Sequence, residues 1–390
     1  MSYSILFVDE DKSILDEIKN EILSMEFKFF FATSGEKALE ILFDNNINIL
    51  VTEINLPKMD GIALLKKVKS LYPGIIKLVL SRAINEKFIN RMVDLNLLKA
   101  FICKPWKENE LMATIEDLIE IDNKLNNEYI KDIIYSSNKL PTLPVIYKEL
   151  NKLIEDDKSD IDDIIKLINT DQVTASRILR IVNSSFYGIK TGAVKTAVIN
   201  LGLLSLKSVI ITSEIFKAEG CNYVELLWEH SCLTNNMTIF LYEYIYKKPI
   251  PDSYHSAGLL HDLGKVLLYK MFELKYEKVI KIKAENPDIS LSLCERNVFN
   301  FSHEELGATV LSNWELPSSI VETALNHHFP EKGTKQHRAI LSIVHIADYY
   351  SWKQIDDKYL PELKQKAFDY LGVNQKEIEE LMKNVNNILH

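Results

Sequence analysis

Short apolar runs separated by amphipathic segments organise the first part of the chain. The runs occupy residues 5–8, 27–31, 49–51, 76–80 and 100–102. Each run is too short and too uniformly apolar to be a half-exposed strand, so the pattern predicts strands that are buried on both faces. The segments between them, such as residues 13–24 and 35–43, carry apolar residues at helical spacing. The alternation predicts an α/β domain with five βα units and a doubly wound, parallel five-stranded sheet.

From about residue 138 onward the strand pattern disappears and helical periodicity replaces it. Residues 161–169, 174–183, 223–246 and 318–327 are the clearest examples. Glycine and proline interrupt the periodicity at Gly188, Gly202, Pro251, Pro287 and Pro317. The second half of the chain is therefore predicted to be all-α.

The junction between the halves has a pattern of its own. Leu111, Ile115, Leu118, Leu125 and Tyr129 keep near-heptad spacing in a stretch without glycine or proline. We expect the last helix of the first domain to continue as a linker, which could pack against a second chain in a homodimer. An ordinary amphipathic surface helix explains the spacing equally well. The predicted domains are residues 1–122 and 138–390, with a helical linker at 123–137.

Composition and charge narrow the function classes. The chain has 390 residues, of which 47% are hydrophobic and 26% charged, so two folded cores are expected. A formal net charge of -9 argues against direct DNA binding or adhesion to anionic membranes. A transcription factor would also require a helix-turn-helix or a basic face, and neither is recognisable.

The cysteines and the hydropathy of the chain indicate the cellular compartment of the protein. Cys103, Cys221, Cys232 and Cys294 form no CxxC pair, as expected of reduced thiols. No signal peptide pattern follows Met1, and no uncharged apolar stretch reaches the roughly 20 residues of a membrane span. We expect a cytoplasmic protein.

Polar residues follow the predicted strands of the first domain. Asp9 and Glu10 follow the first strand, Glu53 the third, Ser81 ends the fourth, and Lys104-Pro105 follows the fifth. Because functional groups of open α/β sheets lie at the carboxyl ends of the strands, these side chains are expected at one edge. Carboxylates gathered there suit Mg²⁺, while a lysine and a hydroxyl suit a transferred phosphoryl group.

The same residues resemble the receiver domain of response regulators. The matching motifs are Val8-Asp9-Glu10-Asp11, Leu56-Pro57-Lys58-Met59-Asp60-Gly61, Leu80-Ser81 and Phe101-Ile102-Cys103-Lys104-Pro105. The resemblance implies that Asp9 and Glu10 bind Mg²⁺ and that Lys104 binds the phosphoryl group. It further implies that Ser81 and Phe101 are the switch residues and that the Lys104-Pro105 bond is cis.

Glu53 departs from this family, which has aspartate at the phosphoacceptor position. The extra methylene moves the carboxylate toward the phosphoryl position and removes the geometry for in-line attack. Two interpretations remain open. Glu53 imitates the phosphorylated form by pairing with Lys104, or the domain is a degenerate receiver retained for dimerisation or docking. Neither interpretation fixes whether the state is on or off, nor which kinase or output partner is involved.

The second half resembles the HDOD family, a relative of the HD phosphohydrolases. The matching motifs are Leu140-Pro141-Thr142-Leu143-Pro144, residues 180–188, Gly258-Leu259-Leu260-His261-Asp262-Leu263-Gly264-Lys265 and His327-His328. The resemblance implies a signalling domain whose enzymatic activity is not established for the family.

Seven residues of this half follow the order of ligands in a helical HD site. They are His230, His261, Asp262, His303, His327, His328 and Asp348. Imidazoles mixed with carboxylates suit Fe, Mn, Zn or Ni. We expect His230, His261, Asp262 and Asp348 to converge, with the remaining histidines close enough for a second ion. Buried or surface histidines without metal are the alternative, and His255, His337, His345 and His390 receive no role.

Two functions from different classes are compatible with these motifs. The first is a two-component regulator whose receiver controls an HDOD domain that acts through protein contacts. The second is a metal-dependent phosphohydrolase acting on a nucleotide or cyclic dinucleotide, in which Lys265 would steady the phosphate. The residues after His328 lack the Gly-Tyr-Pro motif of the related cyclic-dinucleotide phosphodiesterases.

Overall fold

The computed structural model describes residues 3–22, 27–82, 97–107, 109–136, 145–155, 159–183, 191–216, 222–314 and 316–389. The chain divides into two compact units, and the division along the chain falls after Asn123. Each unit is described by itself below. The receiver unit is the α/β half, and the helical unit is the all-α half.

The receiver unit contains the five-stranded parallel sheet predicted from the sequence. Its strands are β1 (Ser4–Val8), β2 (Lys28–Ala32), β3 (Ile49–Thr52), β4 (Ile76–Ser81) and β5 (Ala100–Cys103). They lie in the order β2-β1-β3-β4-β5, and every neighbouring pair is parallel. This order places the ends of β1, β3, β4 and β5 next to one another at one edge of the sheet.

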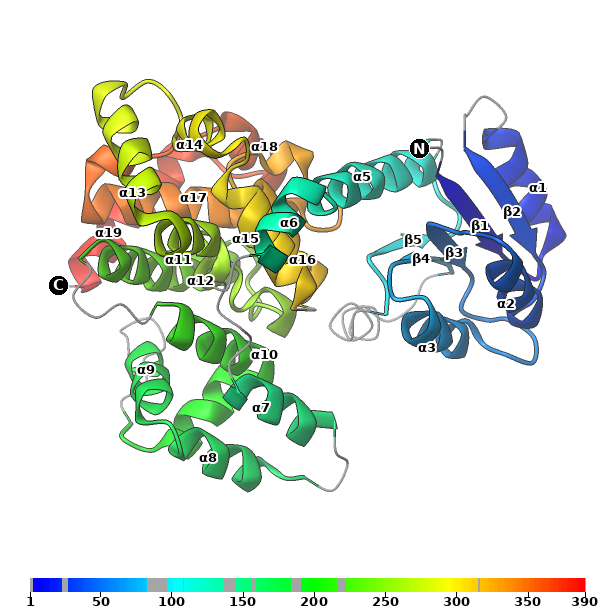
Figure 1. Cartoon of the computed structure of the whole chain (residues 1–390), viewed down its shortest axis with the longest axis horizontal. Coiled ribbons are helices and arrows are strands. Elements are labelled where there is room, and N and C mark those ends of the chain that lie inside the picture. Colours follow the sequence, from blue (N-terminus) through cyan, green and yellow to red (C-terminus); the bar gives the residue numbers. More distant parts are fainter. Residues whose placement is uncertain are drawn as a thin grey trace. The chain divides into compact units, whose positions relative to one another are not determined.

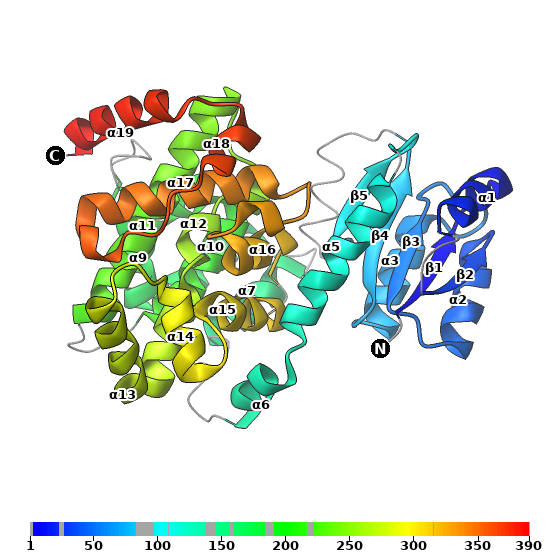
Figure 2. The same ribbon diagram turned by 90° about the horizontal axis from the view of Figure 1, so that it is seen from above.

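Helices cover both faces of the sheet, as Figures 1 and 2 show. α1 (Lys12–Glu21) and α5 (Glu110–Leu125) share one apolar cluster with Ile5 and Phe7 of β1. α2 (Gly35–Asp44) and α3 (Gly61–Leu71) share the other with Leu6 and Val8. Because successive strand residues point to opposite faces, four consecutive apolar residues of β1 supply both cores.

The helical unit contains no strand within its described residues, in agreement with the prediction. Its α-helices are α6 (Glu128–Ser136), α7 (Val145–Glu155), α8 (Ile161–Asn169), α9 (Gln172–Val182), α10 (Val194–Ile215), α11 (Asn222–Tyr246), α12 (Ala257–Leu260), α13 (Leu263–Glu285), α14 (Leu291–Phe299), α15 (His303–Asn313), α16 (Ser318–Asn326), α17 (Arg338–Ile355), α18 (Gln365–Leu371) and α19 (Gln375–Leu389). α7, α8, α9 and α10 pack on one another, and α11, α12, α15, α16 and α17 form a second packed group, which carries or adjoins the buried His230, His261, His303 and His327. α10 bends at Gly202, whose φ of 73° favours glycine.

The expectation of a continuous helix at the junction is wrong. α5 ends at Leu125 and α6 begins at Glu128. The Asn127 side chain accepts hydrogen bonds from the backbone N–H groups of Tyr129 and Ile130, at 3.0 and 3.4 Å, and so starts a new helix. α6 packs on α15, with Tyr129 edge-on to Phe301 and Ile130 fully buried. The apolar spacing did not mark the break, because Tyr129, the last residue of the near-heptad pattern, is 51% exposed and the buried residue of α6 is its neighbour Ile130.

Two of the sequence motifs are not covered by the structure. The Leu140–Pro144 motif and residues 184–188 lie outside the described residues.

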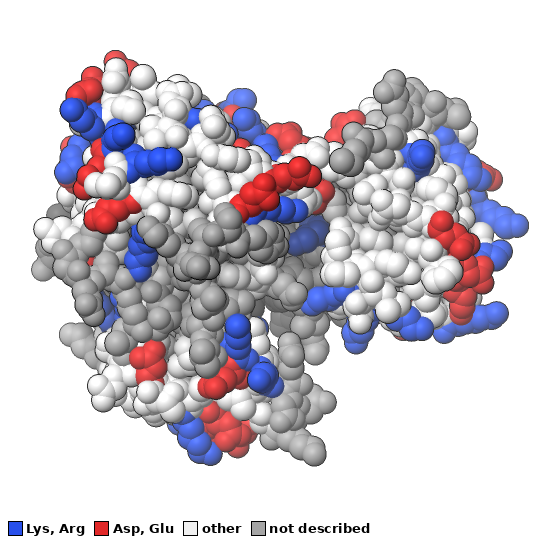
Figure 3. Space-filling view, in the orientation of Figure 1, with Lys and Arg blue, Asp and Glu red and all other residues white. Residues whose placement is uncertain are grey.

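No single helix of the described chain is long and apolar enough to cross a membrane. One bent pair of helices, Val194–Leu203 with Ser205–Ser213, meets the length and composition of a span and nothing more. On the face shown in Figure 3, acidic and basic side chains are interspersed over the described parts of both units.

Candidate functional site

The carboxyl edge of the receiver sheet holds a bonded cluster of four side chains. Lys104 follows β5, and its Nζ donates to Glu53 Oε2 at 2.5 Å and also to Asp9 Oδ2. Ser81, at the end of β4, donates its hydroxyl to Glu53 Oε1. The Lys104-Pro105 bond is cis, as expected. The sheet thus brings together Asp9, Glu53, Ser81 and Lys104, as the sequence predicted.

Glu53 is buried and fully engaged. Its Oε1 also accepts the backbone N–H groups of Ile54 at 2.7 Å and Asn55 at 3.2 Å. Burial alone would raise the pKa of Glu53, but the hydrogen bonds from Lys104 and Ser81 outweigh it and hold the pKa below its usual value. The carboxylate is therefore ionised and has donors on both oxygens.

Gly61 keeps this part of the receiver compact. A Cβ at Gly61 would lie 2.1 Å from the carbonyl oxygen of Glu53. Only glycine permits this approach of the first turn of α3 to the end of β3. The glycine of the Leu56–Gly61 motif therefore positions the backbone of Glu53.

The other predicted receiver residues lie around the cluster. Asp9 is buried, whereas Glu10 is exposed to solvent. Phe101 is half-buried and packs against the apolar cluster of α2 and α3. Because the Lys104 ammonium lies between Asp9 and Glu53, the three carboxylates of the described edge do not form a ligand group around a common point.

In the helical unit, four predicted side chains converge from separate elements. His230 comes from α11, His261 and Asp262 from the turn between α12 and α13, and Asp348 from α17. The Nε2 of His230 lies 3.3 Å from the Nε2 of His261 and 3.1 Å from Asp348 Oδ1. One ligand atom from each of the four residues lies within 4.8 Å of the others. We call these four residues the first ligand group.

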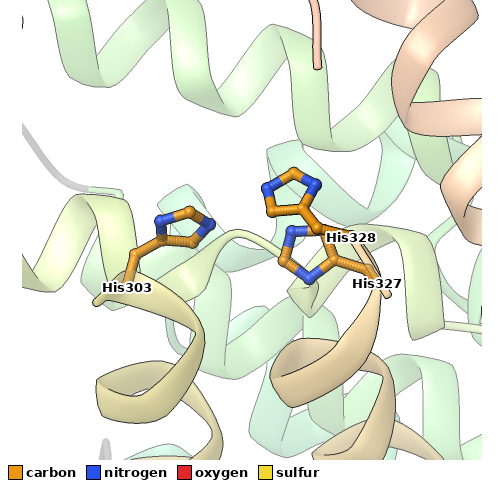
Figure 4. A group of neighbouring side chains, drawn as sticks. All are labelled: His303, His327 and His328. Atoms are coloured by element: carbon orange, nitrogen blue, oxygen red, sulfur yellow. The ribbon is translucent and has the colours of Figure 1, made fainter. Parts of the chain in front are cut away.

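His303, His327 and His328 form a second ligand group, shown in Figure 4. His303 is the first residue of α15, and the other two follow the end of α16. The Nε2 atoms of His303 and His327 lie 3.5 and 3.4 Å from Asp262 Oδ1. Asp262 Oδ2 instead faces His230 and His261, at 3.5 and 3.4 Å. The two oxygens of Asp262 therefore face different groups.

Acceptors on the Nδ1 side orient the histidine rings. His261 Nδ1 lies 2.7 Å from the carbonyl of Gly258, and His303 Nδ1 lies 2.6 Å from Glu295 Oε2. His230 Nδ1 lies 2.8 Å from the Ser351 hydroxyl. The carbonyl and the carboxylate can only accept, so they place a proton on Nδ1 of His261 and His303 and leave Nε2 directed at the cluster, as in many metal sites. The Ser351 hydroxyl orients the His230 ring in the same way.

Several buried atoms of the cluster have no hydrogen-bond partner among the described residues. They are Asp262 Oδ1, His303 Nε2, His327 Nε2 and both carboxylate oxygens of Asp348. Leaving a buried polar atom unpaired costs about 1–3 kcal/mol. Five such atoms directed at one region are the pattern of a site that holds a cation, and their chemistry fits a transition metal.

The charges of the cluster are consistent with ligands. Burial alone would raise the pKa of Asp262, but His261 and Lys265 outweigh it and hold the pKa well below its usual value. Burial lowers the pKa of His327 and, more strongly, of His328. Burial would also lower the pKa of His261, but Asp262 and Asp348 raise it to about 10. Burial would likewise lower the pKa of His303, but Glu295 and Glu304 outweigh it and raise the pKa. A proton on the Nε2 of His261 or His303 must be released before that nitrogen binds a metal.

Sequence reasoning missed three supporting residues. Glu295 of α14 and Ser351 of α17 hold His303 and His230, and the buried Glu304 lies 3.5 Å from His303 Nδ1. Glu304 directly follows a candidate ligand, which was a usable signal. The other two lie eight residues before His303 and three after Asp348, and no local motif marks them. Lys265, expected near a phosphate, donates to Asp262 Oδ2 at 2.6 Å.

Comparisons with known proteins agree with this division. The response regulator receiver domain model matches residues 5–116, and the HDOD domain model matches residues 140–330. The second match ends before Asp348. A solved HDOD domain protein from Geobacter sulfurreducens is 24% identical and covers 69% of this chain and 97% of its own, with a TM-score of 0.55. That likeness shows the fold of the helical unit.

Two curated proteins resemble parts of the chain. An uncharacterized protein of Treponema pallidum is 23% identical over 214 residues, which are 54% of this chain and 41% of that protein. The transcriptional regulatory protein CpxR of Escherichia coli K12 is 30% identical over 149 residues, 38% of this chain and 60% of CpxR. The chain thus matches about half the length of these relatives. The chain contains a response regulator receiver domain followed by an HDOD domain, an architecture that supports a signal-transduction regulator.

Proposed function

We propose that the receiver is held in a phosphorylated-like state by Glu53 and that it controls the HDOD domain. The observation that carries the proposal is the bonding of Glu53, which takes donors from Ser81 and Lys104 on its two oxygens. A hydroxyl and an ammonium are the groups that a phosphoryl oxygen needs in this place. The imitation is incomplete, because a carboxylate carries one negative charge and a phosphoryl group nearly two.

A phosphorylation assay tests the receiver proposal. The parent chain, incubated with acetyl phosphate and Mg²⁺, should gain no stable phosphoryl group. Glu53→Asp should gain one, because a shorter carboxylate frees the phosphoryl position beside Lys104 and can attack phosphorus with loss of acetate. Intact-mass spectrometry reads the result, and Glu53→Asp combined with Lys104→Ala is the control that should lose the gain. Phosphorylation of the parent at Glu53 would contradict the proposal.

For the HDOD domain, we propose that the two ligand groups hold a transition metal, with Fe, Mn, Zn and Ni as the candidates. His230, His261, Asp262 and Asp348 would hold one ion, and His303, His327 and His328 would hold a second with Asp262 shared. Such an ion supplies a Lewis acid for a phosphate ester. The unpartnered buried atoms of the cluster support this assignment.

Output through contacts with other signalling proteins is the function we propose for the whole chain, with a cytoplasmic location and without direct DNA binding. A metal-dependent phosphohydrolase is the second candidate, and Asp262 favours it because its two oxygens face the two ligand groups. Paired metals sharing a ligand are typical of phosphate-ester hydrolysis. Lys265, bonded to Asp262, would be a positioning residue.

Elemental analysis combined with a phosphatase screen separates the two candidates. Bound transition metal with hydrolysis of a phosphate ester supports the enzyme, provided that Asp262→Asn abolishes both. Bound metal without hydrolysis supports the protein-contact output. If the purified chain holds no transition metal and takes up none on reconstitution, the metal proposal fails and the enzyme fails with it.

A further inference from the structure

A cavity of about 350 Å³ lies beside the ligand groups in the helical unit. Three of its lining residues belong to the cluster or touch it: Lys265, His328 and Trp352. Lys265 is bonded to Asp262, and the Trp352 ring stacks on His230 with ring centres 3.9 Å apart. One wall of the cavity is therefore the outer surface of the proposed metal centre.

The exposure of the cluster side chains identifies this wall as the route from solvent to the ligand groups. The His328 side chain is 15% exposed, whereas those of His230, His261, Asp262, His303, His327 and Asp348 are exposed by 1% or less. A ligand that reaches the buried cluster from solvent must pass a wall that is partly exposed. His328 is the one cluster residue that meets this condition, and it lines the cavity.

The lining of the cavity carries both signs of charge, with Lys265, Lys283 and Lys364 against Asp288 and Glu362. Lys283, on α13, donates to the carbonyls of Pro287 and Ile289 at 2.7 and 2.9 Å, which leaves the third hydrogen of the ammonium for a ligand. Lys364 Nζ lies 3.5 Å from Glu362 Oε2, but that carboxylate side chain is 79% exposed and the pair is weak. The Lys364 ammonium also lies over the Phe329 ring, 4.4 Å from its centre. Neither lysine has a buried carboxylate as partner among the described residues, so both ammonium groups can still bind an anion in the cavity.

Aromatic rings supply a second kind of contact. Trp352 and Tyr359 both line the cavity, and their ring centres are 4.8 Å apart. Trp352 is buried and its ring already stacks on His230, so the half-buried Tyr359 is the ring that a planar heterocycle can contact. At about 350 Å³, the cavity is at the lower end of the roughly 300–1,000 Å³ range of ligand sites. That volume suits one nucleotide better than two joined in a ring.

We propose that this cavity binds a phosphorylated compound of mononucleotide size, with its anionic group at Lys283 and Lys364 and its ring against Tyr359. The proposal rests on the phosphohydrolase candidate and specifies the class of its substrate. The location of the reaction, at the two ligand groups, comes from that candidate. The proposal also narrows that candidate, because it excludes a cyclic dinucleotide as the ligand of this cavity. Binding itself requires no turnover, so it can be measured separately.

Equilibrium binding to the full chain tests the proposal, with adenosine 5′-monophosphate as the probe. Lys283→Gln and Lys364→Gln should each weaken binding by about tenfold, the order expected for one charge-assisted hydrogen bond. Lys281→Gln is the matched control on the same helix, because Lys281 is 76% exposed and pairs only with Glu285 at 3.8 Å. Lys283→Arg should retain binding and shows that loss in the glutamine variant is not misfolding.

Five outcomes decide between these possibilities. Binding of the mononucleotide that falls in the two glutamine variants, with no competition from a cyclic dinucleotide, supports the cavity. Equal affinities of Lys283→Gln and Lys281→Gln overturn it, as does an absence of binding at millimolar probe. Binding without hydrolysis keeps the cavity and removes the phosphohydrolase. Hydrolysis that is indifferent to Lys283 and Lys364 keeps the enzyme and removes the cavity.

Discussion

Glu53 and Asp262 are both buried carboxylates compensated by a lysine, yet they differ in one respect. Both oxygens of Glu53 accept hydrogen bonds, from Ser81 and Lys104 and from the backbone. Asp262 accepts from Lys265 on one oxygen, while the other has no hydrogen bond within the described residues and lies 3.5 and 3.4 Å from the Nε2 atoms of His303 and His327. The first carboxylate is saturated and suits a fixed structural charge. The second retains a free ligand position.

The pH dependence of the receiver follows from the lowered pKa of Glu53. A carboxyl group with a lower pKa in the folded state stabilises the fold above its unfolded-state pKa. That contribution is lost as the pH falls through the folded-state value. The stability advantage of the parent over Glu53→Gln should therefore be full at neutral pH and shrink in acid. Hydrogen exchange of peptides covering β3 and β4, corrected for intrinsic rates, measures it; an advantage that grows toward acid would refute the argument.

Substitution of Asp262 should remove a metal ligand, whereas substitution of Glu53 removes a charge that compensates Lys104. Asp262→Asn should reduce the metal content of the purified chain to a small fraction of the parent's, because both ligand groups share this carboxylate. His337→Gln is the control. His337 is equally buried, but its Nδ1 lies 2.8 Å from Glu322 Oε1 and it belongs to neither group. Equal metal content in the two variants, read by mass spectrometry of the elements, would exclude the shared role of Asp262.

At the scale of elements, the metal cluster depends on how closely α13 approaches α15. A Cβ at Gly264 would lie 1.9 Å from the carbonyl oxygen of His303 and 3.0 Å from the backbone nitrogen of Gly307. No side chain fits there without separating the two helices. The ligand His303 is the first residue of α15, so its position depends on this contact.

Gly264→Ala should therefore lower both stability and metal content. Overpacking of this kind typically costs about 1–3 kcal/mol, and the displacement of His303 should weaken the second ligand group. Gly192→Ala provides the comparison, since nothing lies within 4 Å of its added Cβ. Urea unfolding and elemental analysis of both variants give the answer. A Gly264→Ala chain that matches Gly192→Ala in both measurements would contradict the packing argument.

Elements with a strong apolar pattern and residues that belong to a motif were predictable from the sequence, whereas contacts made by residues outside any motif were not. The five apolar runs became β1 to β5, and the predicted helix at 161–169 is α8 without a change of bounds. The ligand order in the sequence also brought seven residues to one place. No sequence motif marked Lys283 and Lys364 as cavity residues. They lie beside His328 only because α13 and a loop distant in the sequence line the same cavity.

The whole molecule consists of two units that share a short covalent connection. Leu118 and Ile121 of α5 are buried, and only Asn126 and Asn127 separate α5 from α6. α6 in turn packs on α15, where Tyr129 lies edge-on to Phe301 with ring centres 6.0 Å apart. Phe301 precedes the ligand His303 by two residues. A change in the receiver core thus has a short route along the chain to the second ligand group.

Insertion of two glycines between Asn126 and Asn127 should break this route. In Glu53→Asp, phosphorylation should change the hydrogen exchange of the peptide that begins α15, because α5 passes its motion to α6 through two residues. The insertion should abolish that change, since glycine gives the junction freedom in φ and ψ, and leave phosphorylation and metal content intact. The same insertion between Gly372 and Val373, in an exposed turn of the helical unit, is the control and should preserve the change. If exchange at α15 responds equally in both insertion variants, the receiver reaches the HDOD domain by another route.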